Sequence, residues 1–172
     1  MAKLLELNQY LIREKFWKFF GNKFRIMDDQ ENLYGFCEQK RFKLKEDLRV
    51  YDDENKNNEW LMIKQKNVVD SWGGFDIFDP KTNEHLGTIR RKFWKSLFRT
   101  KWELLDSQGQ NIGVMQEDSL GYAIARRVFL AILPKKYTIS TIGNNHPITM
   151  RQKFNPIIRK LVVNIPPSHT FD

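Results

Sequence analysis

Short stretches of alternating apolar and polar residues dominate the chain, and they recur in a fixed order around polar turns. Three of them, at 24–36, 75–89 and 102–114, run to an aspartate, pass through a polar turn, and return through an apolar residue followed by glycine. Alternation with a period of two, on both sides of Asp, Asn, Gly or Pro, predicts two antiparallel strands joined by a turn. The glycine is typical of a bulge or tight bend. We therefore expect three β-hairpins, and a looser fourth at 137–151.

Other alternating stretches complete a mainly β chain. They are 9–13, 41–51, 60–66 and 157–165, and polar turns separate them. Together with the hairpins they predict about eleven strands, most of them antiparallel.

One segment departs from this pattern and predicts a helix near 119–133. Asp118 and Ser119 can cap its first turn, and Pro134 stops it. Apart from Gly121, Arg126 and Arg127, the residues from Leu120 to Leu133 are apolar, so the helix is expected to be buried on several sides.

Two parts of the chain resemble each other. The sequence Lys-Phe-Trp-Lys occurs at 15–18 and again at 92–95, and Gly35 and Gly113 occupy matching places in the first and third hairpins. Such self-similarity indicates two related half-units that cover each other or curl into a barrel. The alternative is that similar hairpins arose independently.

Composition restricts the class of protein. The chain has 172 residues, of which 41% are hydrophobic and 29% charged, as expected for one soluble domain. A chain of this length buries roughly 70% of its unfolded surface and needs no disulfide or metal to hold a core. Its longest apolar run, Val128–Leu133, is far below the roughly 20 residues that span a bilayer. The polar N-terminus and the single Cys37 favour a cytoplasmic protein, with peripheral membrane attachment as an option.

Several of these stretches together resemble the tubby C-terminal-like superfamily, in particular the LURP-one-related proteins, which are similar to phospholipid scramblases. The stretches are Tyr10–Lys15, Gly21–Ile26, Phe42–Tyr51, Gly87–Lys92 and Trp102–Gly113. The resemblance implies a single domain over 1–172, folded as an antiparallel barrel of about twelve strands around an apolar C-terminal helix.

That usual C-terminal central helix is expected to be absent, because the chain ends at Asp172 soon after Pro167. A barrel this wide cannot be filled by its own strands. We therefore expect a chain that is truncated at its C-terminus or depends on a partner, as a homo-oligomer, with a helix of another chain inside, or with a lipid tail. The predicted helix near 119–133 is a further candidate, although Arg126 and Arg127 would be costly to bury.

Enzymatic chemistry is not expected, and no cofactor or metal is predicted. His85, His146 and His169 lack a second ligand at metal-binding spacing. Cys37 has no histidine nearby to activate it. Asp28, Asp79 and Asp106 occupy equivalent hairpin positions, where aspartate caps the turn. No phosphate-binding loop, dinucleotide fingerprint or nucleophile elbow is present in the sequence.

A calcium site, which the resemblance to scramblases could suggest, is not expected either. Scramblases place acidic residues before the terminal helix, whereas 165–172 contains one acid, Asp172.

Positive charge is the strongest functional indication. The chain carries 29 Lys and Arg against 21 Asp and Glu, a formal net charge of +8. Residues 90–101 contain six cations, four aromatic or leucine residues and no acid, 15–23 is a milder copy, and in 40–45 cations alternate with Phe42 and Leu44. Such segments suit an anionic membrane surface. The predicted residues for binding lipid headgroups are Lys40, Arg41, Lys43, Arg90, Arg91, Lys92, Lys95 and Arg99.

Three other interpretations stay open. The aromatic residues of these segments can instead pack into the core while the lysines are merely solvated. The basic character and aromatic content also suit single-stranded nucleic acid. Finally, the domain can be a scaffold that binds another protein.

Overall fold

The structure is a computed structural model that describes residues 6–17, 21–40, 47–66, 73–92, 101–118, 135–153 and 158–169. The described part contains twelve strands: β1 (Gln9–Trp17), β2 (Gly21–Met27), β3 (Leu33–Lys40), β4 (Asp47–Tyr51), β5 (Glu59–Gln65), β6 (Gly74–Phe78), β7 (His85–Arg91), β8 (Lys101–Asp106), β9 (Asn111–Glu117), β10 (Lys136–Thr141), β11 (Ile148–Lys153) and β12 (Arg159–Asn164).

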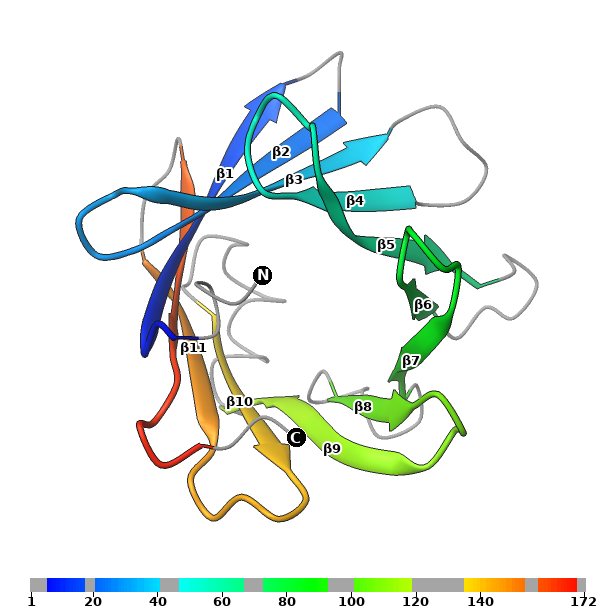
Figure 1. The fold of residues 1–172 in the computed structure, drawn as a ribbon. Coiled ribbons are helices and arrows are strands. Elements are labelled where there is room, and N and C mark those ends of the chain that lie inside the picture. The colour runs from blue at the N-terminus through cyan, green and yellow to red at the C-terminus, as the bar shows by residue number, and fades with distance from the viewer. Residues whose placement is uncertain are drawn as a thin grey trace, which may run out of the picture.

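The strands form a closed barrel in which every neighbour in sequence is a neighbour in space (Figure 1). All pairs are antiparallel, and β1 pairs with β12 to close the ring, with Tyr10 opposite Val163. The prediction of a mainly β antiparallel barrel of about twelve strands is confirmed. The described residues contain no helix, and the helix predicted near 119–133 lies outside them.

The four predicted hairpins are present as β2–β3, β6–β7, β8–β9 and β10–β11. Asp28 and Asp106 cap their turns in the same way. Asp28 Oδ1 accepts hydrogen bonds from the backbone N–H of Gln30 and Asn32, at 3.0 and 2.8 Å. Asp106 Oδ1 accepts from Gln108 and Gln110, at 2.9 and 2.8 Å. The capping interpretation of these aspartates is therefore confirmed, and the two matched hairpins occupy equivalent places half a barrel apart.

Glycine is required in two returning strands because another strand passes very close. A Cβ atom on Gly87 would lie 2.5 Å from the carbonyl oxygen of Leu105, and one on Gly113 would lie 2.7 Å from that of Ser140. The register shifts beside them, at Ile77/Phe78 and Leu104/Leu105, are bulges. A wider side chain would force the strands apart.

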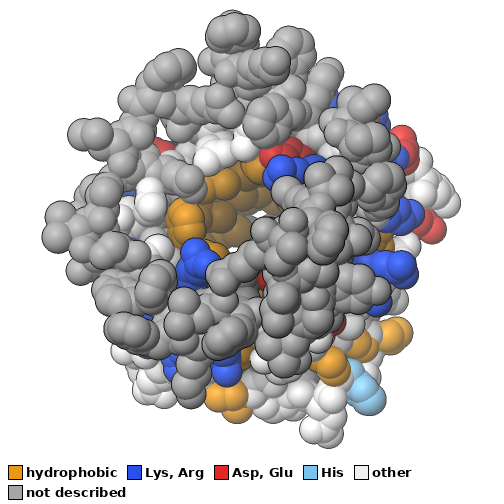
Figure 2. All heavy atoms as spheres, turned by 180° about the vertical axis from the view of Figure 1, so that it is seen from behind, with side chains coloured by type: hydrophobic (Ala, Val, Ile, Leu, Met, Phe, Trp, Pro, Cys, Tyr) orange, Lys and Arg blue, Asp and Glu red, His pale blue; other side chains and the backbone are white. Residues whose placement is uncertain are grey.

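Because side chains alternate along a strand, each strand has one face in the lumen and one on the outer wall. The lumen face is apolar, with a buried cluster of Tyr10, Ile148, Val163 and Ile165, against which Ile12, Ile26, Ile139, Met150 and Leu161 pack. Figure 2 shows apolar side chains inside the opening of the barrel. That a further element fills this lumen stays a prediction.

Candidate anion-binding surface

The two ends of the barrel differ in charge. An up-and-down topology places alternate connections at the same end. The connections at one end, 28–32, 52–58, 79–84, 107–110 and 142–147, carry eight acidic residues and two lysines. Those at the other end, 18–20, 41–46, 66–73, 92–100, 118–135 and 154–158, carry eleven lysines or arginines and three acids. We call these the acidic end and the basic end.

The predicted lipid-binding residues belong to the basic end. Lys40 is the last residue of β3, and Arg90, Arg91 and Lys92 lie where β7 ends. Arg41, Lys43, Lys95 and Arg99 lie outside the described residues, in connections that start from those same strand ends. The topology places the ends of β3 and β7, which are about fifty positions apart in the sequence, at the same end of the barrel with β4, β5 and β6 between them.

Glu103 organises two of these cations. It is buried, with 7% of its side chain exposed, and it forms ion pairs with Arg90, at 2.9 Å, and with Lys92. Burial opposes the charged form of Glu103, but hydrogen bonds from Lys92 and Arg90 outweigh this effect, so the pKa of its carboxyl is lowered. Arg90 keeps 56% of its side chain exposed, so it can still meet a ligand from the solvent side.

Arg91, unlike Arg90 and Lys92, lies beside an aromatic ring. Its Cα partner is Trp102, and its guanidinium carbon lies 5.9 Å from the centre of the Trp102 ring. This distance permits a cation–π interaction. An arginine stacked on an aromatic ring is held in place while its N–H groups stay available to an anion.

On the outer wall over β3 to β8, opposite charges face each other. Glu38 stands opposite Arg49, and Arg90 opposite Glu103. Lys64 stands between Asp47 and Asp76 on the neighbouring strands. We call this the paired wall.

Arg49 is the most strongly held cation of the paired wall. Its Nε donates to Asp47 Oδ1 at 2.6 Å and its Nη1 to Glu59 Oε1 at 2.8 Å. The hydrogen bond to Asp47 contributes most to raising the pKa of this guanidinium, and the one to Glu59 adds to it. The charges of this wall neutralise each other within the fold.

On the outer wall over β10, β11, β12, β1 and β2, cations face cations instead. Four of them form one row across four strands, in the order Lys153, Lys160, Arg13, Arg25. One step along the strands, Lys136 stands opposite Arg151. We call this the basic wall. Like charges directly opposite each other on one face destabilise a sheet unless acids from elsewhere compensate them.

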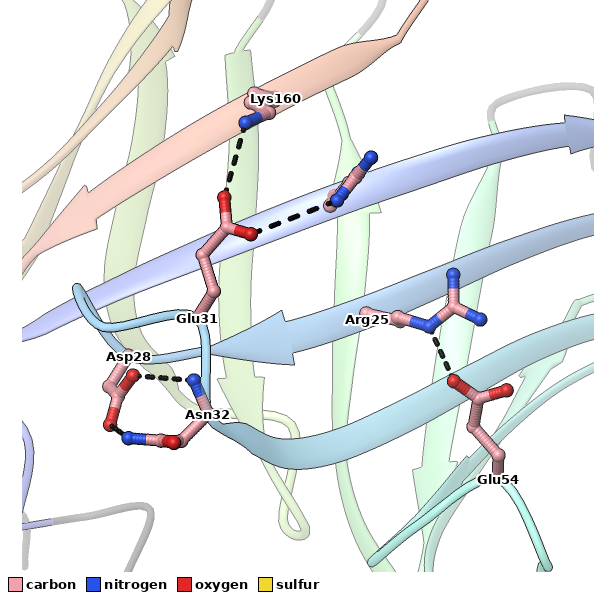
Figure 3. A network of polar contacts seen from close by, with 7 residues as sticks. Arg25, Asp28, Glu31, Asn32, Glu54 and Lys160 are labelled. Carbon is pink, nitrogen blue, oxygen red and sulfur yellow. Dashed lines mark hydrogen bonds and ion pairs between the residues drawn. The ribbon is translucent and has the colours of Figure 1, made fainter.

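Among the described residues, acids reach the row only from turns at the acidic end. Glu31 extends over the wall to Lys160, at 3.4 Å, and Glu54 pairs with Arg25 (Figure 3). Glu31 also lies 4.0 Å from Arg13. In contrast, Lys136, Arg151 and Lys153 make no ion pair within the described part of the chain.

Cys37 and His85, which the sequence analysis considered as reactive groups, have surroundings that the fold explains. Burial, with a contribution from Glu38, raises the pKa of the Cys37 thiol to about 12, so this thiol is not activated. His85 Nε2 lies 3.2 Å from Thr88 Oγ1, whose hydroxyl donates to Asp76. No group of three His, Cys, Asp or Glu side chains that could hold a metal ion occurs among the described residues. Within the same ranges, no helix is long and apolar enough to cross a membrane.

Sequence reasoning missed the basic wall. Its cations come from strands at both ends of the chain, and each strand carries an ordinary alternation of charged and apolar residues. Only the closure of β1 on β12, together with the register, places Lys153, Lys160 and Arg13 side by side.

The family comparison agrees with this fold. Residues 35–167 match the family described as LURP-one-related, which covers the barrel from β3 through the end of β12. No curated protein matches the chain. The LURP-one-related family is not a known enzyme family. Because the match spans well over half of the sequence, this chain belongs to the LURP-one-related family.

Proposed function

We propose that this protein binds anionic phospholipid headgroups at the cytoplasmic face of a membrane through its basic end. The residues involved are Lys40, Arg41, Lys43, Arg90, Arg91, Lys92, Lys95 and Arg99. No catalytic step is part of this proposal.

The difference in charge between the two ends carries the proposal. Eleven cations gather in the connections of one end and eight acids in those of the other. Each Lys or Arg near an anionic membrane surface contributes about 1 kcal/mol. An acidic opposite end is repelled by the same surface, so the charge distribution orients the barrel as well as attracting it.

The mixture of aromatic residues and cations at the basic end favours a membrane surface, rather than a soluble anion, as the ligand. The connection 92–100 contains Phe93, Trp94, Leu97 and Phe98 among its cations. Aromatic rings are favoured at the level of lipid headgroups. Because Arg90 and Lys92 share Glu103, they are pre-positioned at the start of that connection.

Vesicle sedimentation at one fixed salt concentration tests the proposal. Vesicles of phosphatidylcholine alone are compared with vesicles that also contain phosphatidylserine. The variant R41Q/K43Q removes two cations from the basic end, and K56Q/K81Q removes two from the acidic end as the matched control. The first is expected to weaken binding to anionic vesicles about thirtyfold and the control less than about twofold.

Two outcomes contradict the proposal. Equal binding to neutral and anionic vesicles would mean that charge is not recognised. Binding to a single-stranded oligonucleotide but not to either kind of vesicle would instead favour nucleic acid as the partner.

A further inference from the structure

A pocket of about 590 Å³ lies on the basic wall, and at Lys153, the last residue of β11, it reaches the basic end. It is lined by Gln9, Tyr10, Leu11, Asp29, Arg151, Gln152, Lys153, Val162 and Asn164. Of these, Leu11, Arg151 and Val162 are cross-strand neighbours on the outer face, so they form a continuous floor. Its size lies in the range of sites for small molecules.

Two cations, Arg151 and Lys153, line this pocket. Arg151 and Lys153 are exposed, two positions apart on β11, and they point to the same side. Neither makes an ion pair with another described residue, and each stands opposite a further cation, Lys136 or Lys160. Two neighbouring positive charges that form no ion pair with a described residue favour the binding of an anion between them.

The remaining lining residues define the kind of anion. Gln9 Nε2 donates to Asn164 Oδ1 at 2.7 Å, an orientation that leaves the Asn164 amide nitrogen as a donor toward the pocket. Leu11 and Val162 offer an apolar surface beside the cations. Asp29 also lines the pocket, and its carboxylate repels an anionic group, which therefore favours the neighbourhood of Arg151 and Lys153.

We propose that this pocket binds a phosphate ester, with Arg151 and Lys153 as its cationic ligands. The phosphate oxygens lie between the guanidinium and the ammonium group, and the carbon skeleton of the ester lies on Leu11 and Val162. A phosphate group offers several acceptor oxygens, which suits the planar donors of arginine together with a second cation. The site contains none of the eight residues proposed for membrane binding, so variants can test the two sites separately.

The first experiment titrates the whole protein with glycerol 3-phosphate and follows backbone amide shifts by NMR at constant ionic strength. Saturable shifts are expected on β11, β12 and the start of β1. The variant R151Q/K153Q is expected to weaken binding about a hundredfold, because each charge-assisted hydrogen bond accounts for about tenfold. The control K56Q/K81Q carries the same change in net charge and should alter binding less than about twofold.

A second arm identifies the source of the phosphate ester. Vesicles that contain phosphatidic acid present the same chemical group on a lipid. Loss of binding in R151Q/K153Q for glycerol 3-phosphate indicates a soluble ligand, and loss for these vesicles alone indicates a lipid headgroup. The variant R41Q/K43Q should keep its response to glycerol 3-phosphate, which separates this site from the basic end.

A stability measurement shows that the variant is folded. Without phosphate, R151Q/K153Q should raise the midpoint of thermal unfolding by about 2 °C, since it removes charges that face Lys136 and Lys160. The proposal is overturned if R151Q/K153Q and K56Q/K81Q weaken binding equally in both arms, or if wild-type shifts grow without saturating and fall outside the pocket.

Discussion

The two outer walls of this barrel share one geometry and differ in how their charges are arranged. On the paired wall, Glu38 faces Arg49 and Glu103 faces Arg90, so each charge is compensated within the sheet. On the basic wall, Lys153, Lys160, Arg13 and Arg25 face one another. The same scaffold therefore carries one wall whose opposite charges face each other and one wall whose cations face each other and are reached by Glu31 and Glu54 from turns.

The free energies of cross-strand charge pairs support the distinction between the two walls. A cross-strand pair of opposite charges contributes roughly 0.2–1 kcal/mol, and like charges directly opposite each other are destabilising. A whole domain is stable by only about 5–15 kcal/mol. A row of facing cations is thus unfavourable but small against the stability of the domain, and Glu31 and Glu54 offset part of it.

The largest expected effect is on the paired wall. Replacing Arg49 with Gln leaves the buried carboxylate of Asp47 without its bidentate partner and also releases Glu59. Breaking a largely buried pair from one side costs about 3 kcal/mol. Urea unfolding should show R49Q less stable by that amount, while R151Q on the basic wall should be slightly more stable than wild type. Equal destabilisation by both substitutions would remove the distinction between the walls.

A smaller loss is expected for E103Q. The neutral amide keeps the shape of Glu103 but cannot form ion pairs with Arg90 and Lys92, which themselves remain solvated. We expect a loss of about 1.5 kcal/mol in the free energy of unfolding. E84Q, an exposed carboxylate in a turn, is the control and should change stability by less than about 0.5 kcal/mol. If E103Q lowers the free energy of unfolding as little as the control does, the ion pairs of Glu103 with Arg90 and Lys92 do not stabilise the fold.

Lowering the pH should reproduce, in the wild-type protein, part of the loss of stability expected for E103Q. The pKa of Glu103 is lowered in the folded state from its ordinary value of 4.5. Its contribution is therefore complete above about pH 4.5 and decreases as the pH falls through the lowered pKa. The difference in stability between wild type and E103Q should shrink over that range. A difference that stays constant down to pH 3 would contradict the lowered pKa.

Much of the fold could be predicted from local sequence. The aspartate before each turn and the glycine after it mark hairpins because both act within a few residues, as Asp106 does on Gln108 and Gln110. Counting alternating stretches predicts about eleven strands, close to the twelve that the structure contains. The resemblance to a barrel family supplied the closure, which local patterns do not contain.

The candidate site was predictable only where its cations are adjacent in sequence. Residues 40–45 and 90–101 stand out because several cations occur within one segment. Lys153, Lys160 and Arg13 do not, since their proximity depends on the register of β11, β12 and β1. Nothing near Arg90 and Lys92 in the sequence predicts that Glu103, ten or more positions away, forms ion pairs with both.

The smallest expected effect is a gain in stability on the basic wall. Replacing Lys153 with Glu places a carboxylate opposite Lys160 and converts one facing pair of cations into an ion pair. At low salt this should stabilise the barrel by about 0.5 kcal/mol, measured by urea unfolding. Because the side chain at 153 is exposed, the gain should vanish in 1 M salt, where charges are screened beyond about 3 Å. K64E on the paired wall is the matched opposite, since it places a carboxylate between Asp47 and Asp76 and should destabilise the barrel. If K153E and K64E shift stability in the same direction, the arrangement of charges does not distinguish the two walls.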